Sequence, residues 1–201
     1  PTLLKKIRTE FGHNCALMID ANRSFNQSNT LLLNELDKFN LSMIEQPFDK
    51  DSFNDHAQLQ KQLTTPICLD ESITSLSDAQ KMIDKKAGKI INIKPGRVGG
   101  FATAIAIHDL CKKHSIPVWC GGMLETGIGR AYNVALSSLI NFTLPSDLAP
   151  SKNYWEEDIV IPEWTMSQAG TVSVPFKKIG LGVEINYNKI KQLSKESLTL
   201  R

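Results

Sequence analysis

The chain has 201 residues, of which 41% are hydrophobic and 22% charged, and this is the composition of an ordinary globular protein. Its formal net charge of +2 is too small to indicate a nucleic-acid-binding or membrane-surface protein, and no apolar run approaches the roughly 20 residues that a membrane span needs. Cysteines without a CxxC pair are typical of buried thiols in a reducing compartment, so we expect a cytoplasmic location.

The predicted secondary structure alternates between short apolar strands and helices after an opening helix, which Gly12 is placed to end. Because the segments between strands are long enough for helical crossovers, we expect the strands to be parallel. Helix caps are predicted at Ser28, at Ser75 or Ser77, and at Glu125 or Thr126. Strands are predicted near residues 15–20, 42–46, 66–70, 89–94 and 117–120, with a weak sixth strand near 147–149.

One polar residue stands at the carboxyl end of each of four successive predicted strands. These residues are Asp20, Glu45, Asp70 and Lys94, at intervals of 25, 25 and 24 residues. A strand, a helix and their two loops fill roughly that length, since a βαβ unit takes about 30 residues. The carboxyl edge of a parallel sheet is where α/β barrels hold their active sites. Four equivalent positions that read Asp, Glu, Asp and Lys therefore indicate a candidate site at this edge.

The carboxylates of Asp20, Glu45 and Asp70 are hard, anionic oxygen ligands, and no sulfur or imidazole belongs to the set. Such a set suits Mg²⁺, with Mn²⁺ as an alternative, because these ions prefer oxygen and keep positions for water and substrate. Adjacent strands lie about 4.8 Å apart, so three neighbouring strand ends can converge on one ion. The alternative is three unrelated, solvated acids, which the regular spacing disfavours.

Lys94 directly follows the apolar run IINI, and a lysine beside a buried strand is costly to desolvate unless it has a role. A nearby divalent cation and the exclusion of water disfavour the charged amine, so Lys94 is a candidate proton-transferring base. A structural ion pair with Asp70 is the alternative. Metal and lysine together suit removal of a proton next to a carboxylate, since the metal neutralises the charge that develops there.

Five motifs in combination resemble those of the enolase superfamily, whose sites use a Lys or His base with Mg²⁺. The resemblance extends to the o-succinylbenzoate synthase and N-acylamino acid racemase branch of the muconate-cycloisomerase-like subgroup. It implies that Asp20, Glu45 and Asp70 bind Mg²⁺ and that Lys94 is the acid/base lysine of barrel strand six. The mandelate racemase subgroup fits less well, because it has a histidine after strand seven where this chain has Cys120. The motifs are MIDAN, IEQP, CLDES, NIKPGRVGG and GGMLETGIGR.

Further site residues are expected from the resemblance and from position. By resemblance, Asn22 would contact the substrate beside the metal ligands. Arg97 is expected either to orient Lys94 or to pair with a neighbouring acid, and Glu71 either to support the adjacent ligand or to point away. The resemblance also implies a substrate pocket after strand seven, lined by Gly121, Gly122, Met123 and Leu124.

One departure from the family concerns a second lysine. The family carries it in a KxK motif on strand two, across the barrel from strand six. There it is the base and acid of the dehydration, while the strand-six lysine steadies the enediolate. Nothing before Asp20 fits that motif, because Lys5 and Lys6 lie on the predicted first helix. We therefore expect this sequence to be a fragment that binds metal weakly, if at all, and lacks full activity.

The expected fold class is α/β, as a partial (β/α) TIM-type barrel that lacks its first strands and the amino-terminal capping domain. Residues 1–150 would form the carboxyl-terminal part of the barrel, with strands three to eight. The β/α rhythm breaks from about Ser151. Residues 151–201 are therefore expected to form an extended tail that packs on the barrel and on the missing capping domain.

The function implied by the resemblance is that of a Mg²⁺-dependent o-succinylbenzoate synthase. This carbon–oxygen lyase dehydrates a succinyl-hydroxycyclohexadiene carboxylate in menaquinone biosynthesis. N-acylamino acid racemisation or dipeptide epimerisation by the same residues stays open, because all three reactions share the enediolate. A catalytically inert fragment that acts only in assembly is the alternative of another class, since open parallel edges favour association. We expect a small-molecule carboxylate substrate, a homo-oligomer at full length, and no nucleic-acid or membrane partner.

Overall fold

The computed structural model describes residues 1–196 and 198, which fall into two compact units. The first unit comprises Pro1–Trp119 and Asn141–Leu144. The second unit comprises Cys120–Ile140 and the described residues from Pro145 onward. No helix within the described part of the chain is long and apolar enough to pass through a bilayer.

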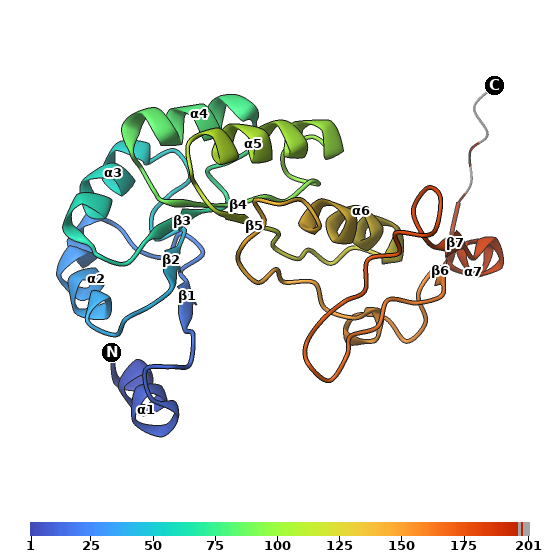
Figure 1. Cartoon of the computed structure of the whole chain (residues 1–201), viewed down its shortest axis with the longest axis horizontal. Coiled ribbons are helices and arrows are strands. Elements are labelled where there is room, and N and C mark those ends of the chain that lie inside the picture. The colour runs from blue at the N-terminus through green and yellow to red at the C-terminus, as the bar shows by residue number, and fades with distance from the viewer. Residues whose placement is uncertain (197, 199–201) are drawn as a thin grey trace. The chain divides into compact units, whose positions relative to one another are not determined.

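The first unit is built on a five-stranded sheet in which the strands are parallel and follow one another in chain order (Figure 1). This order confirms the expectation drawn from the helix-length connections. The paired ladder covers only part of each predicted strand, so the observed strands are shorter than predicted. They are β1 (Met18–Asp20), β2 (Met43–Glu45), β3 (Ile67–Leu69), β4 (Ile90–Asn92) and β5 (Val118–Trp119).

Helical segments connect these strands. They are the 3₁₀ turn η1 (Gln27–Asn29), α2 (Thr30–Asp37), α3 (Phe53–Gln62), α4 (Leu76–Lys85) and α5 (Phe101–Lys113), while α1 (Thr2–Phe11) precedes β1. In Figure 1 the helices α2 to α5 lie along one side of the strands, as the helices of a β/α barrel do. The α/β class and the partial barrel architecture are therefore confirmed.

Three predicted helix ends in the first unit have different outcomes. Helix α1 ends at Gly12, as predicted, where φ is 71°. Ser75 caps α4, as predicted, because its hydroxyl oxygen accepts the backbone N–H of Asp78. The predicted cap at Ser28 is wrong. Asn26 precedes the 3₁₀ turn, and its side-chain oxygen accepts the N–H of Ser28 instead. A short amide side chain can accept the backbone N–H two residues further along the chain.

The strands β2 to β5 are buried on both faces, so they are mostly apolar rather than alternating, whereas β1 is partly exposed. Ile44, Ile67 and Ile91 are fully buried on one face. Met43, Cys68, Ile90 and Trp119 form a buried cluster on the other face, against which Leu144 packs. Because side chains alternate along a strand, Met43 and Glu45 share a face. The face that carries this cluster therefore also carries the predicted site.

The second unit is less regular. Its elements are α6 (Gly127–Ser137), the 3₁₀ turn η2 (Ser151–Asn153), β6 (Val160–Ile161), β7 (Glu184–Ile185) and α7 (Tyr187–Leu193). The antiparallel pairing of β6 with β7 was outside the predicted elements. The weak strand predicted near 147–149 is wrong. Asp147 donates one backbone bond of 2.9 Å to Cys120, but Pro145 and Pro150 lack the N–H groups that a longer ladder needs.

The two compact units do not coincide with the expected ranges of 1–150 for the barrel and 151–201 for the tail. Those ranges refer to a barrel whose tail packs on a separate capping domain. Nothing in the described residues tests that packing, and the domain assignment stays a prediction.

Candidate metal centre

Asp20 and Glu45 stand side by side at the carboxyl ends of β1 and β2. The parallel register pairs these two residues directly. Their surroundings differ, because Glu45 is only 2% exposed whereas Asp20 is open to solvent. The structure thus brings two of the predicted ligands to one edge of the sheet, one of them out of contact with water.

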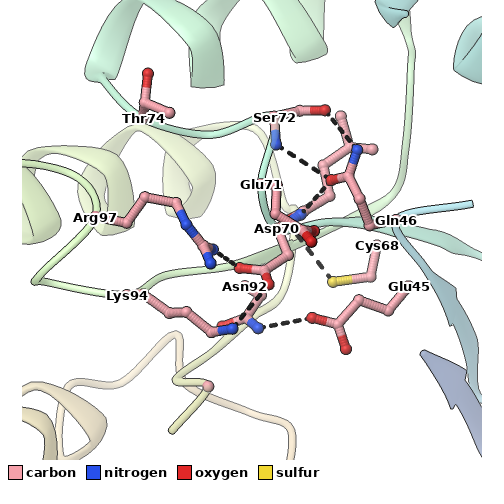
Figure 2. A network of polar contacts seen from close by, with 12 residues as sticks. Glu45, Gln46, Cys68, Asp70, Glu71, Ser72, Thr74, Asn92, Lys94 and Arg97 are labelled. Carbon is pink, nitrogen blue, oxygen red and sulfur yellow. Dashed lines mark hydrogen bonds and ion pairs between the residues drawn. The ribbon is translucent and has the colours of Figure 1, made fainter. Parts of the chain in front are cut away.

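Glu45 is the more perturbed of these two acids. Burial raises the pKa of Glu45 to about 7, and the nearby charge of Asp20 contributes to the rise. The side-chain amide of Asn92 opposes that rise, since it donates a hydrogen bond of 2.8 Å to Glu45 Oε1 (Figure 2). A cation placed beside these acids would favour the charged form of Glu45.

Asp70 lies one residue beyond β3, is 3% exposed, and carries two cationic partners (Figure 2). Lys94 Nζ donates to Asp70 Oδ2 at 2.8 Å, and the guanidinium of Arg97 donates to Oδ1. Both partners follow β4, the next strand of the sheet. The ion pair between Lys94 and Asp70 is therefore present, and of the two roles considered for Arg97 the pairing with an acid is the one observed. Burial lowers the pKa of the Arg97 guanidinium from its usual high value.

Across residues 1–196 and 198, no three Asp, Glu, His or Cys side chains are gathered closely enough to hold a metal ion. At this edge, the two oxygens of Asp70 bond to Lys94 and Arg97. The three acids nevertheless end or follow consecutive strands of one sheet. Their assignment as metal ligands stays a prediction, as does the acid/base role of Lys94.

Asn22 and Glu71 each lie one or two residues beyond a predicted ligand. The backbone N–H of Asn22 donates to Asp20 Oδ1 at 2.9 Å, and a φ of 43° at Asn22 turns the chain sharply after β1. Glu71 forms an ion pair of 3.4 Å with Arg23, and its second oxygen is buried without a hydrogen-bond partner among the described residues. Glu71 is thus directed to the loop after β1. Substrate binding by Asn22 stays a prediction.

The predicted substrate-binding residues after strand β5 belong to the second unit. A Cβ atom at Gly122 would come within 2.5 Å of the Asp147 carbonyl oxygen, so glycine is required there by close packing. Met123 and Leu124 are 45% and 76% exposed. The part of these residues, and of Gly121, in binding a substrate stays a prediction.

Two buried polar residues of this edge are absent from the predicted site. Asn92 is 1% exposed and bonds to Glu45, and Gln46 is fully buried and bonds to the backbone of Asp70 at 2.9 Å. Both have a signal in the sequence, since a buried amide within or just after an apolar strand must find hydrogen-bond partners. Asn92 also precedes Lys94 by two residues, so strand alternation places both on one face.

Parallel strands joined by helices, with acids and a lysine at one edge, define a barrel-type domain of the α/β class. A family model described as "Enolase C-terminal domain-like" matches residues 2–189, and the chain belongs to that family. Among solved structures, an enolase superfamily member from Listeria innocua Clip11262 superposes with a TM-score of 0.92 at 42% sequence identity. The alignment covers 97% of this chain and 52% of that one.

Curated relatives carry two functional names. The o-succinylbenzoate synthase of Bacillus subtilis (strain 168) is 53% identical over 190 residues, which is 94% of this chain and 50% of the relative. The N-succinylamino acid racemase of Amycolatopsis sp is 47% identical over 180 residues, which is 90% of this chain and 48% of the relative. The chain therefore spans about half the length of the curated relatives that it matches.

Proposed function

We propose that this chain is the metal- and lysine-bearing part of an o-succinylbenzoate synthase, a cytoplasmic lyase. The observation that carries the proposal is the sheet edge at which consecutive strands present Asp20, Glu45, Asp70 and Lys94. Three relatives named o-succinylbenzoate synthase, at 47–53% identity, support it. The proposed substrate is a small carboxylate, a succinyl-hydroxycyclohexadiene carboxylate on the menaquinone route, and the proposed full-length state is a homo-oligomer.

The donor chemistry of this edge fits Mg²⁺. Asp20, Glu45 and Asp70 offer only carboxylate oxygens, the ligands that Mg²⁺ and Mn²⁺ prefer. Glu45 supports the assignment because a buried carboxylate with a raised pKa is one that a counter-cation would stabilise. For Asp70 to join, one of its oxygens would exchange Lys94 or Arg97 for the ion. When bound, Mg²⁺ would neutralise the charge that develops on the substrate carboxylate.

In the proposed reaction a base removes the proton next to the substrate carboxylate, and the hydroxyl group then leaves as water. Lys94 would steady the resulting enediolate with its ammonium group. Its Nζ is already held at the edge by the 2.8 Å contact with Asp70, and its side chain is only 14% exposed. The proton itself would be moved by the second lysine of the family, whose motif has no match before Asp20. We therefore expect full turnover only from a protein that also carries that lysine.

Racemisation of N-acylamino acids is the second candidate function. The relative from Amycolatopsis, at 47% identity, favours it specifically. The same edge would serve, because the enediolate would be reprotonated on its other face and no water would be lost. Dipeptide epimerisation would use the residues in the same way. Assays of dehydration and of racemisation on the full-length protein would separate these activities.

Calorimetric titration with Mg²⁺ tests the metal site on the chain itself. We expect weak binding, in the millimolar range, that Asp70→Asn abolishes, because one of three anionic ligands is lost. Asp51→Asn is the matched control, since Asp51 is an exposed acid of the same unit and its replacement changes the net charge equally. Binding of Mg²⁺ in the control should equal that of the unsubstituted chain.

Two results would count against the proposal. If the unsubstituted chain does not bind Mg²⁺, the chain is better described as an inert fragment that acts only in assembly. If Asp70→Asn binds Mg²⁺ as well as the unsubstituted chain does, the ion binds elsewhere. Dehydration by this chain alone at the rate of the full-length protein would instead refute the need for the second lysine.

A further inference from the structure

Gln46 directly follows Glu45, and its main chain bonds to β3 and to the loop after β1. It is fully buried and has a φ of 37°. Its backbone N–H continues the β2–β3 ladder to the Cys68 carbonyl oxygen, at 2.9 Å. Its own carbonyl turns away from β3, because of the left-handed backbone, and accepts the N–H of Arg23 in the loop after β1, at 2.8 Å.

The Gln46 side chain takes the place of the ladder bond that its backbone gives up. A regular parallel ladder would next join the N–H of Asp70 to the Gln46 carbonyl. Instead, Gln46 Oε1 accepts the N–H groups of Asp70, at 2.9 Å, and of Ser72, at 3.2 Å (Figure 2). The amide nitrogen donates to Ser72 Oγ at 2.7 Å and to the Phe48 carbonyl at 3.0 Å. All four hydrogen-bonding positions of the amide are used, and this pattern determines its orientation.

We infer that Gln46 is the positioning residue of the metal site, holding the backbone of Asp70 at a set place relative to Glu45 and to the loop that follows Asp20. The inference rests on the proposed function, since the three acids matter together only if they share a cation. Through its backbone and its side chain, Gln46 bonds to the segments that follow β1 and β3, while its neighbour Glu45 ends β2. Partners that orient metal ligands typically alter metal affinity about 10- to 100-fold when they are replaced.

A second buried glutamine provides the comparison that separates positioning from stability. Gln60 is 7% exposed, and its Oε1 accepts the N–H of Ile67 at 2.7 Å. Its amide nitrogen donates to the carbonyls of Leu63 and Thr65 at 3.3 and 3.2 Å. Gln60 therefore holds the amino end of β3, and Gln46 holds the residues that follow the carboxyl end of β3. Both do so through a side-chain amide that bonds to backbone groups. Only Gln46 contacts a predicted ligand.

The test compares Gln46→Met with Gln60→Met, because methionine is unbranched and close in size to glutamine but cannot hydrogen-bond through an amide. Thermal denaturation should show both variants folded and destabilised to a similar degree, since each leaves buried backbone groups without partners. In Mg²⁺ titrations, the dissociation constant should rise about tenfold or more for Gln46→Met and stay within about twofold for Gln60→Met.

A milder pair of variants serves if Gln46→Met does not fold. Ser72→Ala removes one acceptor from the Gln46 amide, at the 2.7 Å contact. Ser42→Ala removes an exposed hydroxyl of the same unit, which donates to the Leu17 carbonyl at 3.1 Å ahead of β2. Ser72→Ala should raise the Mg²⁺ dissociation constant by about threefold, whereas Ser42→Ala should leave it unchanged.

The outcomes separate this inference from the function on which it rests. Suppose that Asp70→Asn abolishes Mg²⁺ binding but Gln46→Met binds Mg²⁺ as the unsubstituted chain does. That result would overturn the role of Gln46 and leave the proposed function standing. If Gln46→Met is unfolded, unchanged binding in Ser72→Ala would have the same meaning. Equal loss in Gln46→Met and Gln60→Met would also overturn that role, since the effect would then be one of stability. An unsubstituted chain that takes up no Mg²⁺ would overturn the proposed function and, with it, this role.

Discussion

The two compact units differ in how their helices α4 and α6 begin. In the first unit, strands and helices alternate at regular intervals, and α4 is capped by Ser75 from its own sequence. In the second unit, the side chain of Thr126 makes no cap bond at the start of α6. Asp158, 31 residues further along the chain, accepts the N–H of Gly127 there instead. The start of α4 is therefore capped from within its own segment, whereas the start of α6 is capped by a side chain remote in sequence.

Asp158 shows how the second unit is organised. It is 3% exposed, and it accepts hydrogen bonds from Gly127 N at 2.9 Å and from Ser151 Oγ at 2.6 Å. Trp164 Nε1 donates to the carbonyl of the same Gly127 at 2.8 Å. A Cβ atom at Gly127 would lie 2.1 Å from Val160, so the close approach requires glycine. A residue pattern read along the chain does not contain such a network, because its members are far apart in sequence.

The largest contrast should come from matched strand substitutions. Ile91→Ala, in the fully buried centre of β4, should cost about 4 kcal/mol of unfolding free energy, because it leaves a cavity in a packed core. Ile161→Ala, in β6, should cost less than about 0.5 kcal/mol, since that side chain is 54% exposed. Urea denaturation of both variants measures the difference. Equal costs would show that the second unit depends on its strands as the first does.

The stability of the first unit should depend on pH through His56. Burial lowers the pKa of His56 from 6.5 to about 4, and its Nε2 accepts the N–H of Phe48 at 3.2 Å. The unfolded chain therefore binds this proton at a higher pH than the folded chain does. The free energy of unfolding should therefore be highest above about pH 6.5 and should fall with the pH. At pH 4 it should be lower by about 3 kcal/mol.

His56→Gln separates this titration from that of the carboxylates, because an amide can still accept the Phe48 N–H but does not bind the proton. Urea denaturation across the pH range should show the stability of the two chains converging toward acid pH. A constant difference between them would mean that His56 does not titrate in this way.

The network around Asp158 should be the next most sensitive feature. Asp158→Ala should cost about 2 kcal/mol, because Gly127 N and Ser151 Oγ lose a buried acceptor. Amide hydrogen exchange should speed up in α6 and stay unchanged in α4. Glu156→Ala, an exposed acid close by in sequence, is the control and should leave both helices protected. Faster exchange in both helices would argue against a separate network in the second unit.

The smallest effect concerns the two helix caps. Ser75→Ala should cost about 1 kcal/mol, because its oxygen accepts the Asp78 N–H at the start of α4. Thr126→Ala should cost only a few tenths of the free energy that Ser75→Ala costs, since the Thr126 side chain makes no cap bond at α6. Thermal denaturation of the two variants measures both losses of stability. A larger loss for Thr126→Ala would contradict capping of α6 by Asp158.

In the candidate site, too, the sequence pattern predicted some of the residues that bond to one another and missed others. The 25-residue spacing from Asp20 to Glu45 anticipated two residues that the register pairs directly. Spacing left two roles open for Arg97, because an arginine side chain is long enough to reach several neighbours. The fold decides among them and brings the guanidinium of Arg97 to Asp70. Gln46 was missed for a similar reason, since its role depends on a left-handed backbone that directs its carbonyl away from β3.

In the first unit the sequence by itself determined the order of the strands, their parallel arrangement and the edge at which Asp20, Glu45, Asp70 and Lys94 end or follow consecutive strands. It could do so because strand and helix periods are local properties of the chain. Only the tertiary structure decided which polar groups bond to one another: Lys94 and Arg97 to Asp70, the Gln46 amide to the turn after β3, and Asp158 to the start of α6. Buried polar groups must find partners wherever the fold brings them, and those partners lie too far along the chain for any local pattern to specify.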